Sequence, residues 1–163
     1  MEKVELNKTM HLSEHFTLGE VTKTSVKTAD GNIPSHVAIE NLKNLCENWL
    51  EELRENYNLI YEGVGDCKGD EPIIITSGYR SPEVNKAVGG APTSNHLTGC
   101  AVDIRCVGIE QAIRYACILL DISDGTKRDY DELFIERSKQ GRYWVHFAVR
   151  PKDNRRKINF IIG

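Results

Sequence analysis

The sequence lacks the features that mark secreted, membrane-spanning and disulfide-stapled proteins. No stretch approaches the roughly 18 consecutive apolar residues that a membrane span requires, and residues 1–6 contain no apolar segment typical of a secretory signal. The five cysteines are odd in number and form no Cys-x-x-Cys pair, which favours reduced thiols in a protein made in a cytoplasm. We therefore expect cytoplasmic synthesis and no membrane span.

Excess positive charge is missing as well. The formal net charge is −3, whereas non-specific binding to DNA or RNA needs a basic face. A basic run at residues 150–157 fits a solvated turn better than a binding surface. Hydrophobic residues make up 40% of the 163 positions and charged residues 28%. This hydrophobic content is enough for one domain to form a core without stabilising disulfides or metals. We expect no nucleic-acid partner.

Apolar periodicity predicts a mixture of helices and strands after an irregular, polar segment at residues 1–35. In that segment, Thr17 and Glu20 could cap one short helix. Helices are predicted at residues 36–56, 82–87 and 110–120. The last of these is expected to face the core with Ile113, Ala116, Cys117 and Leu120, and a loop is expected at residues 124–126. Strands are predicted at residues 71–76, 100–106, 131–137, 143–149 and 158–162, with the third and fourth forming a hairpin. The pattern is that of a small α+β domain.

Asp103, Glu136 and His146 each lie on the face of a predicted strand opposite its apolar residues. If the strands share one sheet, these three side chains share its open face, because a register slip would expose the core residues. Glu136 and His146 can share that face only if the hairpin loop has an odd number of residues or contains a bulge. Taking residues 138–141 as the loop gives four, but we follow the apolar phase, since predicted boundaries are less reliable.

The side chains of His96, Asp103 and His146 form a ligand set typical of zinc. Two imidazoles and one carboxylate leave a coordination position open for chemistry. His96 lies on a loop rich in Gly, Ser and Thr, seven residues before Asp103. Glu136 is the candidate general base and acid. Arg80 follows a strand end and could bind a substrate carboxylate or stabilise an oxyanion.

Each candidate also has an ordinary structural interpretation, and spacing alone leaves both interpretations open. A single histidine is more often structural or exposed than a ligand, and a carboxylate on a strand face is usually solvated. Arg80 could form a surface salt bridge, and Trp144 could pack against the protein instead of contacting substrate. Ser94 could cap its loop or hydrogen-bond a metal ligand. We interpret His11 and His15 as surface residues.

Several motifs together resemble the D-alanyl-D-alanine carboxypeptidase family of zinc peptidases, in its phage and prophage carboxypeptidase-like and endolysin-type branch. The motifs are Ser77-Gly-Tyr-Arg80-Ser-Pro-Glu-Val-Asn85, Ser94-x-His96-x-x-Gly99-x-Ala101-x-Asp103 and Trp144-Val-His146, with Leu12-x-x-x-Phe16-Thr-Leu-x-Glu20 near the start. The likeness covers nearly the whole chain. It implies one domain at residues 1–163, with an antiparallel sheet and helices on one face, as in hedgehog and D-Ala-D-Ala peptidases.

This resemblance assigns zinc to His96, Asp103 and His146 and implies that Arg80 contacts substrate. Ser94 and Trp144 are our further candidates for substrate binding. Many relatives carry the catalytic acid/base three residues before the last histidine ligand, a position that Tyr143 occupies here. Glu136 resembles the place where the nearer branch has its glutamate.

The resemblance implies a zinc-dependent peptidase acting on peptidoglycan stem peptides. It would be a D-Ala-D-Ala carboxypeptidase or an L-Ala-D-Glu-type endopeptidase, expected as a monomer and released to the cell wall by phage or prophage lysis. One alternative is an inactive zinc-binding or cell-wall-binding module of phage origin. Another is a non-enzymatic phage structural component.

Overall fold

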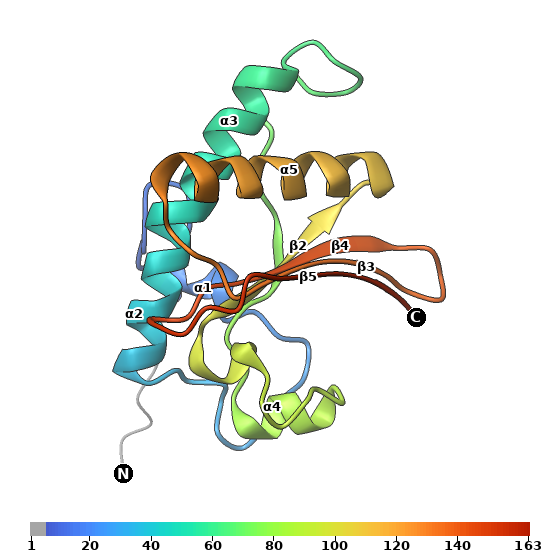
Figure 1. Cartoon of the computed structure of the whole chain (residues 1–163). Coiled ribbons are helices and arrows are strands. Elements are labelled where there is room, and N and C mark those ends of the chain that lie inside the picture. Colours follow the sequence, from blue (N-terminus) through green and yellow to red (C-terminus); the bar gives the residue numbers. More distant parts are fainter. Residues whose placement is uncertain (1–5) are drawn as a thin grey trace.

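A five-stranded sheet in the order β1-β2-β4-β3-β5 forms the centre of the protein (Figure 1). The computed structural model describes residues 6–163, so most of the segment searched for a secretory signal lies outside the described residues. The strands are β1 (Ile75–Ser77), β2 (Ala101–Cys106), β3 (Glu132–Arg137), β4 (Tyr143–Ala148) and β5 (Lys157–Ile162). All five fall within or close to the predicted segments, although β1 is shorter than expected.

Three of the four strand pairs are antiparallel, as predicted, whereas β5 runs parallel to β3. The parallel pairing arises because the chain returns from β4 to the beginning of β3 before it enters β5. There, the Lys157 amide donates to the Asp131 carbonyl oxygen at 2.9 Å. The expectation of a wholly antiparallel sheet is corrected at this one edge.

The β3–β4 hairpin pairs its residues as the apolar pattern predicts, with Glu136 and His146 on the same face of the sheet. Phe134 pairs with His146 and Glu136 with Trp144, so the even-numbered residues of both strands share one face. Five residues, 138–142, separate the two strands. The loop therefore has the odd number that the shared face requires, and the four-residue count was wrong.

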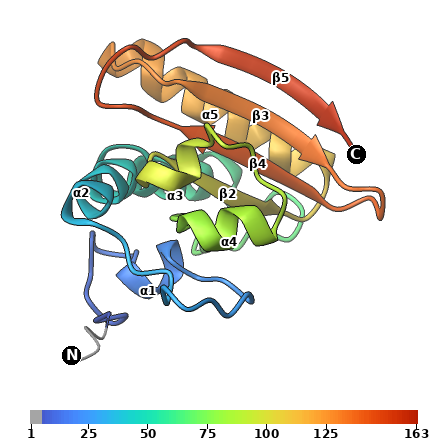
Figure 2. The ribbon, with the colours of Figure 1, turned by 90° about the horizontal axis from the view of Figure 1, so that it is seen from below.

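The longer helices cover one face of the sheet, which confirms the α+β fold class (Figures 1 and 2). They are α2 (His36–Leu45), the π-helical turn η1 (Cys46–Leu50), α3 (Glu51–Tyr61) and α5 (Ile109–Thr126). The first three follow one another without a break and extend past the predicted end at residue 56. Trp49 packs on Phe147 of β4 with ring centroids 5.0 Å apart, which fixes this helix against the sheet.

Helix α5 is longer than predicted, and its buried side was misassigned. Asp124–Thr126, expected to form a loop, is the last turn of the helix. Ile113 and Cys117, expected to face the core, are exposed, whereas Tyr115 and Leu119 are buried. The many apolar residues of this helix allow more than one inward face, and packing on the sheet and α3 selects between them.

Shorter helical segments lie outside this layer. α1 (Leu18–Val21) begins with the expected capping box of Thr17 and Glu20, and α4 (Pro82–Ala87) begins after Ser81 as predicted. α4 and the 3-10 turn η2 (Asn95–Thr98) lie on the other side of the sheet from α5 (Figure 1). Within residues 6–163, no helix combines the length and apolarity that a membrane crossing demands.

Candidate metal centre

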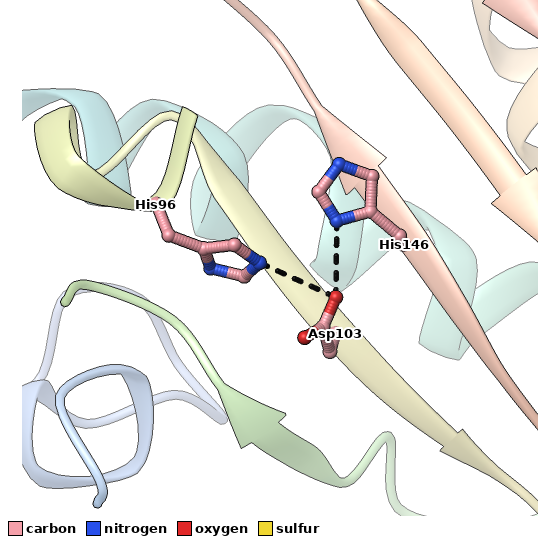
Figure 3. A group of neighbouring side chains, drawn as sticks. All are labelled: His96, Asp103 and His146. Atoms are coloured by element: carbon pink, nitrogen blue, oxygen red, sulfur yellow. Dashed lines mark hydrogen bonds and ion pairs between the residues drawn. The ribbon is translucent and has the colours of Figure 1, made fainter. Parts of the chain in front are cut away.

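Three side chains from separate elements converge beside η2 (Figure 3). His96 comes from η2, Asp103 from β2 and His146 from β4. Asp103 and His146 are direct partners across β2 and β4, which places their side chains on the same face. Asp103 Oδ1 lies 3.0 Å from His146 Nδ1 and 3.4 Å from His96 Nε2.

This part of the sheet is covered, contrary to the expectation of an open face. Asp103 is only 7% exposed, and Ala101 on the same side of β2 is fully buried. η2 packs against β2 and carries His96 over the strand. The carboxylate therefore lies among protein groups and is largely shielded from solvent.

Short-range contacts hold η2 in place. Ser94 Oγ accepts a hydrogen bond from the His96 amide at 3.2 Å, as an N-cap does. Gly99 ends the turn with φ 72°, and a Cβ atom there would overlap the carbonyl oxygen of Ala38 in α2. Only glycine combines this backbone conformation with so close an approach, so the Gly99 position sets how η2 rests on α2.

The hydrogen-bond partner of His96 determines which of its nitrogens is available to a metal. Nδ1 lies 2.6 Å from the carbonyl oxygen of Gly78. A carbonyl oxygen only accepts, so Nδ1 carries the proton and donates, leaving Nε2 to face Asp103. Metal-binding histidines usually donate their other ring nitrogen in this way.

The three donors fit the dimensions of a zinc site. One atom from each of His96, Asp103 and His146 lies within 4.8 Å of the other two. Zinc at about 2.0–2.1 Å from tetrahedral ligands separates neighbouring donor atoms by roughly 3.3 Å. The observed separations of 3.0 and 3.4 Å lie on either side of that value. Two imidazoles and one carboxylate also match a catalytic zinc set.

The electrostatics of the site favour a cation. Burial would raise the pKa of Asp103, but the neighbouring His96, together with a hydrogen bond from His146, lowers that pKa well below its ordinary value. Burial lowers the pKa of His146, whereas Asp103 and Glu132 raise it to about 9. Asp103 and Glu132 therefore keep the imidazole of His146 protonated and positively charged. A bound metal ion could provide this positive charge in place of the proton.

Glu136, the predicted acid/base residue, lies in the same cavity of about 590 Å³ as the three candidate ligands. Its Oε2 accepts a hydrogen bond from Trp144 Nε1 at 3.0 Å. Burial, followed by the negative charge of Asp103, raises the pKa of Glu136. A carboxylate with a raised pKa beside a metal site is suited to proton transfer.

Tyr143, at the position where the resemblance suggested an acid/base residue, has a side chain that points away from the candidate ligands. Alternation along β4 puts Tyr143 on the face opposite His146, where it packs against the hydrophobic core. It is not among the residues that line the cavity of the candidate ligands. Tyr143 is therefore poorly placed to exchange protons there.

The candidate substrate residues Arg80, Ser94 and Trp144 all line this cavity. Arg80 also contacts the protein, with Nη2 3.3 Å from Asp103 Oδ2 and Nε donating to Ser77 Oγ at 3.0 Å. These contacts use some of the N–H donors of the guanidinium group and orient the group toward Asp103. The structure thus brings every predicted site residue to one cavity.

Several residues that line the cavity were not predicted as site residues, and two of them, Glu132 and Asn95, form a hydrogen-bonded pair behind His146. Glu132 Oε1 lies 3.1 Å from His146 Nε2 and accepts a hydrogen bond from Asn95 Nδ2 at 2.5 Å. Glu132 has the same strand phase as Glu136, so the argument that selected Glu136 could have found it. Asn95 had no such signal, because a polar residue beside a histidine in a loop is ordinary.

A second group with metal-ligating side chains, Glu14, His15 and Glu51, lies on the helical side of the protein. His15 Nδ1 is 2.8 Å from Glu51 Oε2. Glu14 and His15 are exposed, and exposed acidic groups often cluster without a metal. The interpretation of His15 as a surface residue is confirmed by its exposure.

A protein-family model described as Peptidase M15 matches residues 14–126 of the chain. The match covers more than half of the sequence and includes Arg80, His96 and Asp103. Glu136 and His146 follow the matched range, and the sheet brings them to the same cavity. No curated protein matches the chain.

Proposed function

The chain belongs to the peptidase M15 family, a family of metallopeptidases, and we propose that it is a zinc-dependent hydrolase of peptide bonds in peptidoglycan stem peptides. The observation that carries this proposal is the convergence of His96, Asp103 and His146. They meet at distances suited to one zinc ion, in a cavity that also contains Arg80 and Glu136.

The proposed ligands leave zinc with a net charge of +1, because the two imidazoles are neutral and Asp103 is ionised. When bound, zinc polarises a carbonyl group and lowers the pKa of water. Glu136 lines the cavity without being one of the three ligands. It would accept a proton from the attacking water and return it to the leaving amine.

Arg80 is the proposed anchor for the substrate. Its guanidinium lies at the edge of the ligand group and can pair with a carboxylate through two parallel hydrogen bonds. A terminal carboxylate at Arg80 would suit a D-Ala-D-Ala carboxypeptidase, and a side-chain carboxylate would suit an L-Ala-D-Glu endopeptidase. Trp144 and Ser94 would contact the remainder of the peptide. The protein would reach its substrate in the cell wall after phage or prophage lysis.

Metal analysis combined with a peptidoglycan digest tests the proposal. We expect about one zinc per chain and zinc-dependent release of peptide fragments with new amino groups, whose masses identify the bond cleaved. His146→Ala should lose the metal, because two remaining ligands hold zinc poorly. His11→Ala, an exposed histidine outside the cavity, is the matched control and should retain it.

The other outcomes separate the alternatives. Zinc without turnover would indicate an inactive zinc-binding or cell-wall-binding module, and a protein without zinc or turnover would indicate a structural component. Stoichiometric zinc in His146→Ala would contradict the ligand assignment.

A further inference from the structure

We propose that Glu132 is a positioning residue that orients the imidazole of His146, and that Asn95, anchored on buried Asp131, holds Glu132 in place. This inference rests on the proposed function in one respect, because it takes His146 as a zinc ligand. It goes further by assigning separate roles to the two glutamates that β3 places in the cavity.

The two ring nitrogens of His146 have different partners. Nδ1 lies 3.0 Å from Asp103 Oδ1, and Nε2 lies 3.1 Å from Glu132 Oε1. If Nδ1 binds the metal, Nε2 carries the proton and donates a hydrogen bond to the Glu132 carboxylate. Phe134 stacks on the ring, with centroids 5.2 Å apart and planes 20° from parallel. Phe134 thus sets the plane of the ring, and Glu132 sets its rotation within that plane.

The side chain of Asn95 uses all its polar atoms to hold this arrangement. Its Nδ2 donates to Glu132 Oε1 at 2.5 Å and to Asp131 Oδ2 at 2.8 Å, while Arg150 Nε donates to its Oδ1 at 3.0 Å. Flipping the amide would turn its oxygen toward two carboxylates, so one orientation is strongly favoured. Because Asn95 precedes His96, the same contacts join η2 to β3.

Asp131 gives Asn95 a rigid partner. Its side chain is 0% exposed and accepts hydrogen bonds from the Arg155 backbone amide and Nε, each at 3.0 Å, and from Arg155 Nη2 at 2.8 Å. Arg150 Nε lies 3.2 Å from the same carboxylate. Two guanidinium groups therefore compensate the buried charge of Asp131, which a single neutral amide could not do.

The surroundings of Glu132 and Glu136 separate their roles. Glu132 Oε1 contacts both His146 and Asn95, and Glu132 Oε2 lies 3.5 Å from Arg155 Nη2. Glu136 has one side-chain hydrogen bond, from Trp144, among the described residues. A carboxylate held by several donors is suited to orienting a ligand, whereas one with a free oxygen can exchange protons with substrate.

Zinc affinity, measured by competition with a chromophoric chelator, tests the assignment without requiring turnover. Glu132→Ala should weaken zinc binding about 10- to 100-fold, the usual range for loss of a carboxylate behind a metal-binding histidine. Glu132→Gln should restore most of the affinity, because its amide oxygen can still accept from His146 and Asn95. Glu136→Ala removes a carboxylate from the same face of β3 and should leave the affinity within about twofold of wild type.

Crystal structures of the metal-free wild type and Glu132→Ala provide a second measurement. We expect the His146 ring to rotate in the variant, and Glu132 to leave His146 in Asn95→Ala. An unchanged ring with unchanged zinc affinity in Glu132→Ala would overturn the inference, as would equal losses for the Ala and Gln variants. If the wild type takes up no zinc, the proposed function fails, while the ring orientation still decides the role of Glu132.

Discussion

At the scale of single residues, hydrogen-bond partners determine what each member of the site can do. His96 donates through Nδ1 to Gly78, whereas His146 directs Nδ1 toward Asp103 and Nε2 toward Glu132. The two histidines would therefore bind a metal through different nitrogens. Residue type alone does not reveal this difference, because both nitrogens of a free imidazole are potential ligands.

Replacing Glu136 by Gln tests the proton-transfer role. The amide cannot take up a proton, so we expect kcat to fall by about two to four orders of magnitude while zinc content stays unchanged. Peptidoglycan digestion and metal analysis of the same preparation measure both quantities. Tyr143→Phe is the control and should retain activity, because Tyr143 lies on the opposite face of β4. Full activity of the Glu136→Gln variant would show that another group transfers the proton.

Trp144→Phe tests how the pKa of Glu136 is set. The indole hydrogen bond stabilises the ionised carboxylate, so its removal should raise the pKa of Glu136 further. A base must be deprotonated to act, and at a given acidic pH less of Glu136 would then be ionised. The acidic limb of the kcat/KM profile should move to higher pH. A limb that stays in place or moves to lower pH would speak against this coupling.

At the scale of elements, the sequence predicted which face of β2, β3 and β4 each side chain lies on, but it did not predict which segment covers that face. Alternation placed Glu136 and His146 on one face, and the five-residue hairpin loop confirms that phase. The same alternation suggested an open face around Asp103, which η2 covers instead. The face on which a strand residue lies depends on local alternation along the strand. Whether another segment covers that face depends on how a loop distant in sequence packs.

The packing of η2 on α2 can be tested at Gly99. In Gly99→Ala, the new methyl group would overlap the Ala38 carbonyl oxygen at a positive φ. We expect a loss of more than about 2 kcal/mol in the free energy of unfolding, with weaker zinc binding because His96 moves. Chemical denaturation and chelator competition measure the two effects.

Gly141 provides the matched control for this substitution. It also has a positive φ, of 81°, but a Cβ atom there meets nothing within 4 Å. Gly141→Ala should therefore lose only about 1 kcal/mol, from backbone strain alone, and keep its zinc affinity. Equal losses at both glycines would show that contact with α2 contributes nothing.

At the scale of the whole molecule, Asp131 joins parts of the chain that are distant in sequence. It links the beginning of β3 to η2 through Asn95 and to the β4–β5 connection through Arg150 and Arg155. This connection explains why β5 enters the sheet beside β3 and runs parallel to it. That residues 1–163 form a single domain stays a prediction.

Acid titration tests the contribution of Asp131 to stability. Burial would raise its pKa, but hydrogen bonds from Arg155 and Asn95 lower it from 3.8 to about 2. The ionised carboxylate therefore stabilises the fold fully above about pH 4, and this contribution disappears as the pH falls through 2. It amounts to roughly 2 kcal/mol. Unfolding free energies at several pH values should show a shallower acid dependence in Asp131→Asn, and an unchanged slope would contradict this account.

The sequence by itself determined the α+β class and the phases of β2, β3 and β4, and it predicted the types of the candidate ligands, because alternation, capping and ligand chemistry are properties of short segments. It also indicated Glu136 and Arg80. The tertiary structure alone decided that β5 runs parallel to β3, that Ile113 of α5 faces solvent, and that Glu132 and Asn95 belong to the site. These features depend on contacts between residues dozens of positions apart, whose distances and orientations no local pattern contains.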